Sequence, residues 1–205
     1  MRIRFLTSTP LDIRRGSGTY VGIRVLARAL EQLGHRVEYE TPKIELPIYT
    51  AQRLLFNRRL RPSPEFDLTV GFDMDGYRIA GQPGHIASLK GVIADEVRFE
   101  AGLTRLTMGI QARCEQAHVQ KAARVLATSR YSAERAREFY GLKEPPAVVP
   151  ELIDLEEWRR ALGPLPHGRG SVVGASHSRT ALPSTFRHSS KSISSGTTAG
   201  ASFSP

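Results

Sequence analysis

The sequence predicts an α/β fold, in which a parallel sheet is flanked by helices, and the first 40 residues carry the prediction. Arg2–Ser8 (RIRFLTS) is a short run rich in Ile, Phe and Leu, as expected of a buried strand. Residues 36–40 (RVEYE) alternate like a second strand. Between them, apolar residues recur at the helical steps of three, four and three: Ile23, Leu26, Leu30 and Leu33. Two strands joined through a helix run parallel, with a right-handed crossover.

The same patterns continue to about residue 162. Further strands are predicted at Asp67–Phe72, His85–Leu89, Arg124–Ala127 and Ala147–Val149. Helices are predicted at 49–60, 95–123 and 132–140. Glycines suit the ends of two helices, at Gly34 and Gly141, and Ser129 is a candidate N-cap. The sum of these elements is a Rossmann-like sheet.

The long segment 95–123 is expected to be mostly helical, although two glycines, Gly102 and Gly109, favour a bend or a division there. Its apolar residues share one face, which is expected to contact the core: Phe99, Leu103, Leu106, Ile110, Cys114 and Ala117. Cys114 is the single cysteine, so an internal disulfide is excluded and a reducing compartment fits.

Composition and charge favour a cytoplasmic protein. No stretch approaches the roughly 20 apolar residues of a membrane span, and Met1–Ser8 lacks the pattern of a signal peptide. The net charge is +9, but four of the 29 basic and none of the 20 acidic residues lie in 163–205, which leaves an excess of five in 1–162. That excess suits anionic substrates or a membrane surface. No basic stripe interleaved with aromatic residues indicates specific nucleic-acid binding.

The composition changes abruptly at Gly163. Residues 164–205 contain eleven serines, no acidic residue and only scattered apolar ones, so a disordered tail is expected. A tail of this kind also fits an out-of-frame reading of a truncated parent gene, and a basic tail that binds nucleic acid or membrane is the alternative. The domain boundary is therefore expected near residue 162.

Residues 49–61 carry apolar and basic side chains together: Leu54, Leu55, Phe56 and Leu60 stand beside Arg53, Arg58, Arg59 and Arg61. A basic amphipathic helix can lie on an anionic bilayer, so peripheral membrane contact is one interpretation. The other is a connecting helix that packs on the sheet and exposes its arginines.

Taken in order, several motifs resemble the N-terminal domain of glycosyltransferase family four, whose members are retaining enzymes of the two-domain GT-B type. The first is a strand followed by Gly16-Ser17-Gly18 and a helix ending in Leu33-Gly34-His35-Arg36-Val37. The second is residues 124–132 (RVLATSRYS), and the third is residues 148–154 (VVPELID), with Glu151 and Leu152 in place of the family's Asn-Gly. The resemblance covers about residues 1–162.

This resemblance implies a Rossmann-like, acceptor-side domain of an enzyme that moves a sugar from a nucleotide-sugar donor to an acceptor. The nucleotide sugar would be a co-substrate, and no other cofactor is implied. In the family a second domain holds the donor and would begin after Asp154, so this chain is expected to be incomplete and inactive alone. A non-catalytic module that binds a glycan, an anionic lipid or a partner protein is the alternative.

The glycine loop, Gly16-Ser17-Gly18-Thr19, is the first candidate site. Backbone N–H groups at a helix N-terminus favour anions, so the loop could contact a donor phosphate or simply turn the chain. A dinucleotide fingerprint, with Glu38 as its acidic residue, is a weaker interpretation because the loop does not directly follow the strand.

Other candidates follow predicted strands, at the edge where open parallel sheets bind ligands. Residues 73–77 (DMDGY) form a predicted loop of this kind. After the next strand, Lys90 could hold an anionic acceptor and Asp95 could bond hydroxyls. The candidates for this acceptor cleft are Lys90, Asp95, Glu96, Arg98, Ser129 and Arg130. Helix capping and dipole complementation explain some of them equally well. No metal site is expected from the spacing of the histidines.

Overall fold

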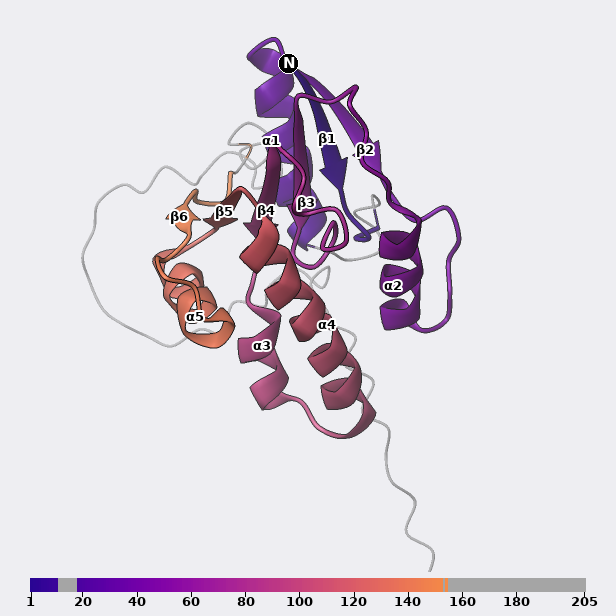
Figure 1. The fold of residues 1–205 in the computed structure, drawn as a ribbon, viewed down its shortest axis with the longest axis vertical. Coiled ribbons are helices and arrows are strands. Elements are labelled where there is room, and N and C mark those ends of the chain that lie inside the picture. The colour runs from indigo at the N-terminus through magenta and orange to yellow at the C-terminus, as the bar shows by residue number, and fades with distance from the viewer. Residues whose placement is uncertain (11–17, 153, 155–205) are drawn as a thin grey trace, which may run out of the picture. The chain divides into compact units, whose positions relative to one another are not determined.

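The computed structural model describes residues 1–10, 18–152 and 154, which form a six-stranded parallel sheet flanked by five α-helices (Figure 1). This confirms the predicted α/β fold. The strand order is β2-β1-β3-β4-β5-β6, and every neighbouring pair is parallel. The strands are β1 (Arg2–Leu6), β2 (Arg36–Glu40), β3 (Leu68–Phe72), β4 (His85–Leu89), β5 (Arg124–Ala127) and β6 (Ala147–Val148).

Helices lie on both faces of the sheet (Figure 1) and connect consecutive strands, except β3 and β4, which are joined by turns over residues 73–84. They are α1 (Gly18–Gln32), α2 (Tyr49–Arg59), the short α3 (Ile93–Glu96), α4 (Gly102–Lys121) and α5 (Arg130–Tyr140), with a 3-10 turn at Val97–Phe99. α1, α4 and α5 thus carry crossovers between strands that are parallel neighbours in the sheet, as expected of this architecture.

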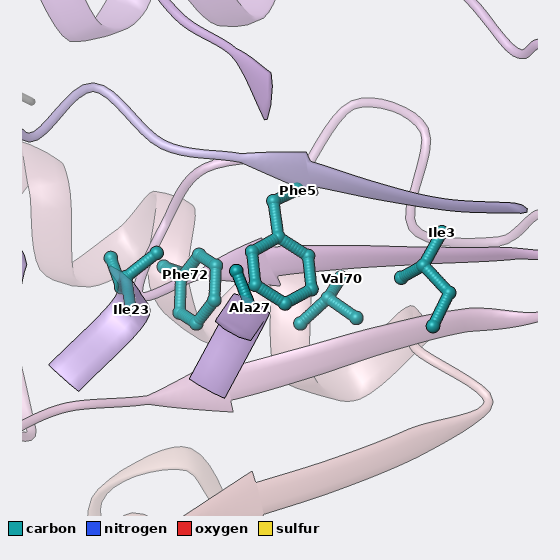
Figure 2. Close-up of a cluster of buried hydrophobic side chains, with 6 residues drawn as sticks. All are labelled: Ile3, Phe5, Ile23, Ala27, Val70 and Phe72. Carbon is teal, nitrogen blue, oxygen red and sulfur yellow. The ribbon is translucent and has the colours of Figure 1, made fainter. Parts of the chain in front are cut away.

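The core on the α1 face consists of interleaved side chains from β1, β3 and α1, which Figure 2 shows: Ile3, Phe5, Ile23, Ala27, Val70 and Phe72. The rings of Phe5 and Phe72 meet edge to face, with centroids 5.1 Å apart. The strand residues of this cluster alternate along β1 and β3, because successive side chains of a strand point to opposite faces.

The opposite face packs against the remaining long helices. Leu6 packs in a cluster with Phe56 of α2, with Leu60 directly after α2 and with Ile79 from the connection between β3 and β4. Farther along the sheet, Ala87 and Leu89 of β4 pack against Val119 of α4 and against Ala136 and Tyr140 of α5. The apolar side of α2 therefore lies partly in the core, whereas Arg58 and Arg59 are exposed.

Helix ends follow the predicted capping residues. Gly34, after α1, has a φ of +83°, and Gly141, after α5, has a φ of +65°. Both lie in the left-handed region that glycine adopts without strain. The hydroxyl of Ser129 accepts a hydrogen bond from the Ser132 backbone N–H at 3.0 Å, which confirms Ser129 as the N-cap of α5.

Gly141→Ala should lower the free energy of unfolding by about 1 kcal/mol, because alanine at this positive φ is strained although no neighbouring atom blocks a Cβ. Gly109→Ala is the matched control, since Gly109 lies inside α4 with equally open space around it. That change should stabilise the protein by up to about 1 kcal/mol, because alanine is the better helix former. Urea unfolding of both variants checks the opposite signs, and a loss of stability in both would contradict the assignment.

The predicted helical segment 95–123 divides at one of its two glycines, and the expected core face is wrong for its N-terminal half. α4 begins at Gly102, which has a φ of +55°, whereas Gly109 leaves the helix intact. The predicted face is exposed at four positions, Phe99, Leu103, Leu106 and Ile110, and Cys114 is half-buried. Polar residues of α4 are buried in their place, notably Gln111, Glu115 and His118. Their hydrogen bonds to distant partners, given below, make this burial favourable.

Two sequence predictions lie outside the described residues. Gly16 and Ser17 of the glycine loop are among residues 11–17, and the tail 163–205 lies wholly beyond residue 154. The expectations for both segments stay predictions.

Candidate functional site

A cavity of about 360 Å³ lies at the carboxyl edge of the sheet, beyond β3 and β4. The strand order reverses between β1 and β3, because β2 lies on one side of β1 and the later strands on the other. Open parallel sheets bind ligands outside the carboxyl ends of their strands at such a switch point. We call this space the switch-point cavity; it is lined by Thr19, Tyr49, Arg53, Asp73, Lys90, Gly91, Ile93, Glu96, Met108 and Gln111.

Asp73 is the first residue after β3 and adopts an unusual backbone conformation. Its φ is +53°, and it is the single residue other than glycine with positive φ among those that the structure describes. Its backbone N–H donates to the Ser88 carbonyl at 3.0 Å. Its carboxylate accepts the backbone N–H of Lys90 at 2.9 Å. Strained backbone of this kind clusters at functional sites and persists only where surrounding contacts hold it.

Lys90 follows β4 and places an ammonium group beside the cavity. Its stem is largely buried, and Nζ lies 5.5 Å from the centre of the Phe72 ring. Nζ donates to a carboxylate oxygen of Glu151 at 2.8 Å. Lys90 is therefore fixed by its backbone to Asp73 and by its side chain to the segment after β6.

A buried network of charged and polar side chains holds Arg53 in the cavity wall. Arg53 of α2 donates to Gln111 at 2.9 Å and contacts Asp75 at 3.3 Å. Asp75 also accepts hydrogen bonds from the backbone N–H and the hydroxyl of Ser8, at 2.7 and 2.6 Å, and from the Asn57 amide at 3.0 Å. Burial alone would lower the pKa of Arg53, but the charge of Asp75 raises it above its ordinary value. Arg53 is therefore a permanent cation in the cavity wall.

A pair of buried histidines contacts the backbone carbonyl of Asp73. Their Nε2 atoms are 2.8 Å apart, and Nδ1 of His118 lies 2.5 Å from the Asp73 carbonyl oxygen. Because a carbonyl only accepts, His118 donates from Nδ1 and accepts at Nε2 from His85. Burial lowers the pKa of His85 to about 3 and that of His118 to about 4, so both rings are neutral at pH 7.

Glu115 supports the start of α3 and the loop that carries Lys90. Its carboxyl accepts the backbone N–H of Ile93 at 2.9 Å and a short hydrogen bond from the Tyr140 hydroxyl. The Tyr140 oxygen in turn accepts the Ala94 backbone N–H at 3.1 Å. Complete burial, together with the charge of Asp73, raises the pKa of Glu115 to about 8, so this carboxyl is protonated at pH 7.

Two carboxyl groups in the cavity wall also differ from ordinary surface acids. Burial raises the pKa of Asp73, and burial followed by the charges of Asp73 and Asp95 raises that of Glu96. The cavity wall therefore presents two carboxyl groups, the hydroxyl of Thr19 and two cations, Lys90 and Arg53. This mixture suits a ligand that carries several hydroxyls and an anionic group.

The structure brings three of the predicted site residues together, since Thr19, Lys90 and Glu96 all line the cavity. Gly18 begins α1 beside Thr19. The sequence did not single out Arg53, because it belongs to a helix whose arginines looked solvated. A signal was present in Asn57, one turn after Arg53: a basic and an amide side chain four residues apart share a helix face.

The other predicted residues have structural contacts instead. Asp95 accepts hydrogen bonds from Arg98 at 3.1 Å, Arg135 at 2.8 Å and Tyr131 at 2.6 Å. These bonds, above all the one from Arg135, lower the pKa of Asp95 to about 2. This cluster ties α3 to α5. Ser129 caps α5, and Arg130, its first residue, is exposed. None of these four predicted residues (Asp95, Arg98, Ser129 and Arg130) is part of the cavity lining.

No group of three His, Cys, Asp or Glu side chains is placed to hold a metal ion in the part of the chain that the structure describes. Among the same residues, each helix is too short or too polar to cross a bilayer. Comparison with known proteins adds no assignment: no protein-family model and no curated protein matches the sequence.

Proposed function

We propose that residues 1–162 form the acceptor-side domain of a glycosyltransferase of the GT-B type, similar to family four. The observation that carries this proposal is the switch-point cavity, in which Thr19, Asp73, Lys90 and Glu96 converge beyond the carboxyl ends of β3 and β4. The order of sequence motifs and the Rossmann-like fold support it independently.

The chemistry of the cavity fits a sugar. Carboxylates and a threonine hydroxyl accept hydrogen bonds from hydroxyl groups, and the raised pKa of Asp73 and Glu96 makes each carboxylate a stronger base for the proton of an attacking hydroxyl. Lys90 and Arg53 favour negative charge, such as a phosphate on the acceptor or the diphosphate that leaves the donor. In the family this resembles, the donor itself is bound mainly by a second domain.

A thermal-shift titration of the full-length chain with a panel of nucleotide sugars and sugar phosphates tests the proposal. A ligand that binds only the native state stabilises it by about 2.7 kcal/mol at one hundred times its dissociation constant. We expect at least one ligand of the panel to raise Tm, and Lys90→Met to reduce that rise by more than half.

Lys121→Met is the matched control, because Lys121 is an exposed lysine in the last turn of α4 and lies outside the cavity lining. The control should respond as the parent protein does. A panel without any shift, or a shift that Lys90→Met leaves intact, would contradict the proposal.

A second candidate function is a non-catalytic module that binds an anionic lipid surface. The observation that favours it is the exposed apolar stripe of Phe99, Leu103, Leu106 and Ile110 on and before α4, next to exposed Arg105. Exposed apolar residues flanked by basic ones bind the interface of anionic bilayers. Cosedimentation with phosphatidylserine vesicles that Leu106→Glu abolishes would favour this module; binding unaffected by that change would reject it. The predicted contact through 49–61 stays a separate proposal, testable with Arg58→Glu.

A further inference from the structure

The segment after β6 carries a carboxylate into the neighbourhood of the switch-point cavity. Val149 donates its backbone N–H to the Ala127 carbonyl at 2.9 Å, which extends the pairing with β5. Two residues later, Glu151 reaches Lys90, whose Nζ donates to it at 2.8 Å. Glu151 itself keeps 40% of its side-chain surface exposed, whereas Lys90 keeps 11%. Glu151 is therefore the more solvent-accessible partner of this ion pair.

Helix α1 has room for this carboxylate only because residue 22 is glycine. A Cβ at Gly22 would lie 1.3 Å from the Glu151 Oε1 atom, which is far inside contact distance. Glycine inside a helix is less favourable than alanine. The missing side chain at Gly22 thus leaves the space on α1 that the Glu151 carboxylate occupies.

Lys90 stands between two spaces. It lines the switch-point cavity on one side and, on the other, the small pocket of about 70 Å³ that Gly22 and Glu151 also line. An ammonium group whose side chain is largely buried needs an anionic partner or hydrogen-bond acceptor. In this structure Glu151 provides it, and an anionic group in the cavity would be the alternative partner.

We propose that Glu151 is an intramolecular competitor of the ligand: it occupies Lys90 in the ligand-free protein, and a phosphate or carboxylate group of the ligand displaces it. The proposal rests on the proposed function in taking the switch-point cavity as the substrate site, and it adds that the substrate is anionic. Displacement breaks the contact between the segment after β6 and Lys90, whereas the ion pair of Asp154 with Arg28 of α1, at 3.8 Å, stays in place. Occupation of the cavity is thereby coupled to the stretch that resembles the family's interdomain hinge.

Calorimetric titration of the full-length chain with inorganic phosphate, and separately with glucose 1-phosphate, tests the competition. The apparent dissociation constant equals the intrinsic one divided by the fraction of protein in which Lys90 is free of the competitor. Removing the competitor therefore lowers the apparent dissociation constant to the intrinsic value. For a half-exposed ion pair of this kind we expect Glu151→Gln to bind phosphate about five times more tightly. Gly22→Ala should act in the same direction, because its Cβ displaces the carboxylate while the helix gains stability.

Two further variants separate competition from a general change in charge. Glu144→Gln neutralises an exposed carboxylate in the loop before β6 and should leave phosphate binding unchanged. Adding Lys90→Met to Glu151→Gln should remove the gain. Equal affinities in Glu151→Gln and Glu144→Gln would overturn the proposal, as would a gain that survives Lys90→Met.

The two ligands separate this proposal from the transferase function. A gain for glucose 1-phosphate that exceeds the gain for phosphate supports a sugar phosphate as the anionic ligand, and an equal gain supports competition at the anion alone. Phosphate binding that competes with Glu151, without any response to the sugar panel, would overturn the transferase proposal and support the competition. Sugar binding that is indifferent to Glu151 would overturn only the competition.

Discussion

Asp75→Ala should lower the free energy of unfolding by about 4 kcal/mol, the largest loss expected of any single change considered for this protein. Asp75 is 1% exposed and is the counter-charge of buried Arg53. Its removal leaves the buried guanidinium without its ion-pair partner, Ser8 loses the acceptor of two hydrogen bonds, and the Asn57 amide loses one of its two acceptors. Breaking a buried pair from one side is strongly destabilising because the desolvated charge remains.

Urea unfolding of Asp75→Ala beside Asp67→Ala measures this effect. Asp67 is an exposed aspartate whose carboxylate accepts the backbone N–H of Arg2 at 2.7 Å, so its loss should cost about 1 kcal/mol or less. If both variants lost the same amount, the network of Arg53 and Asp75 would not support the cavity as described. Loss of ligand binding by Asp75→Ala under conditions where it remains folded is expected as well, because Arg53 lines the cavity.

Glu115→Gln should make the protein more stable at alkaline pH, the second large effect. The folded state raises the pKa of Glu115 to about 8 from an ordinary value near 4.5, so the folded protein binds this proton more tightly than the unfolded chain. The contribution of this group is therefore fully present below about pH 4.5 and is lost as pH rises towards 8, by about 1.4 kcal/mol for each unit. Glutamine resembles the protonated carboxyl and does not titrate.

The difference in unfolding free energy between variant and parent, measured from pH 5 to pH 9, isolates this group from the histidines. We expect a difference within about 1 kcal/mol at pH 5 and an advantage of roughly 4 kcal/mol for Glu115→Gln at pH 9. Glu134→Gln, at an exposed position of α5, is the control and should show no trend. A flat difference for Glu115→Gln would mean that the carboxyl is ionised in the folded protein.

Local signals predicted much of the fold. The run of Ile and Phe in β1 and the helical spacing of Ile23 in α1 depend on neighbours in sequence alone, and both segments form as expected. Caps are equally local, which is why Ser129 and Gly141 fall where they were predicted. The extension of α5 to begin at Arg130 follows directly from that cap.

Burial of polar residues could not be predicted in the same way. On a helical wheel, Gln111, Glu115 and His118 look like the solvent side of α4, and the apolar stripe that includes Leu106 looks like its core side. Their partners are far away in sequence: the amide of Gln111 donates to the Thr50 hydroxyl, 61 residues distant. Periodicity registers hydrophobicity but not such partners, so it assigned the wrong face.

Sequence reasoning predicted only those residues of the candidate site whose position depends on strand order. Lys90 and Glu96 follow a strand, and the rule that ligands bind at carboxyl ends depends only on strand order. Arg53 reaches the cavity from α2, and Asp73 depends on the histidine pair for its conformation. Both facts require the tertiary structure.

The most direct test of the central claim, that the switch-point cavity binds the ligand, is an NMR titration of the ¹⁵N-labelled full-length chain with nucleotide sugars and sugar phosphates. Backbone amide shifts should concentrate at Thr19, Asp73, Lys90 and Gly91, which line or border the cavity. Shifts that instead concentrate around Gln82 and Gly84, in the cavity of about 400 Å³ at the opposite edge of the sheet, would contradict the claim. The absence of localised shifts with every ligand would contradict it too.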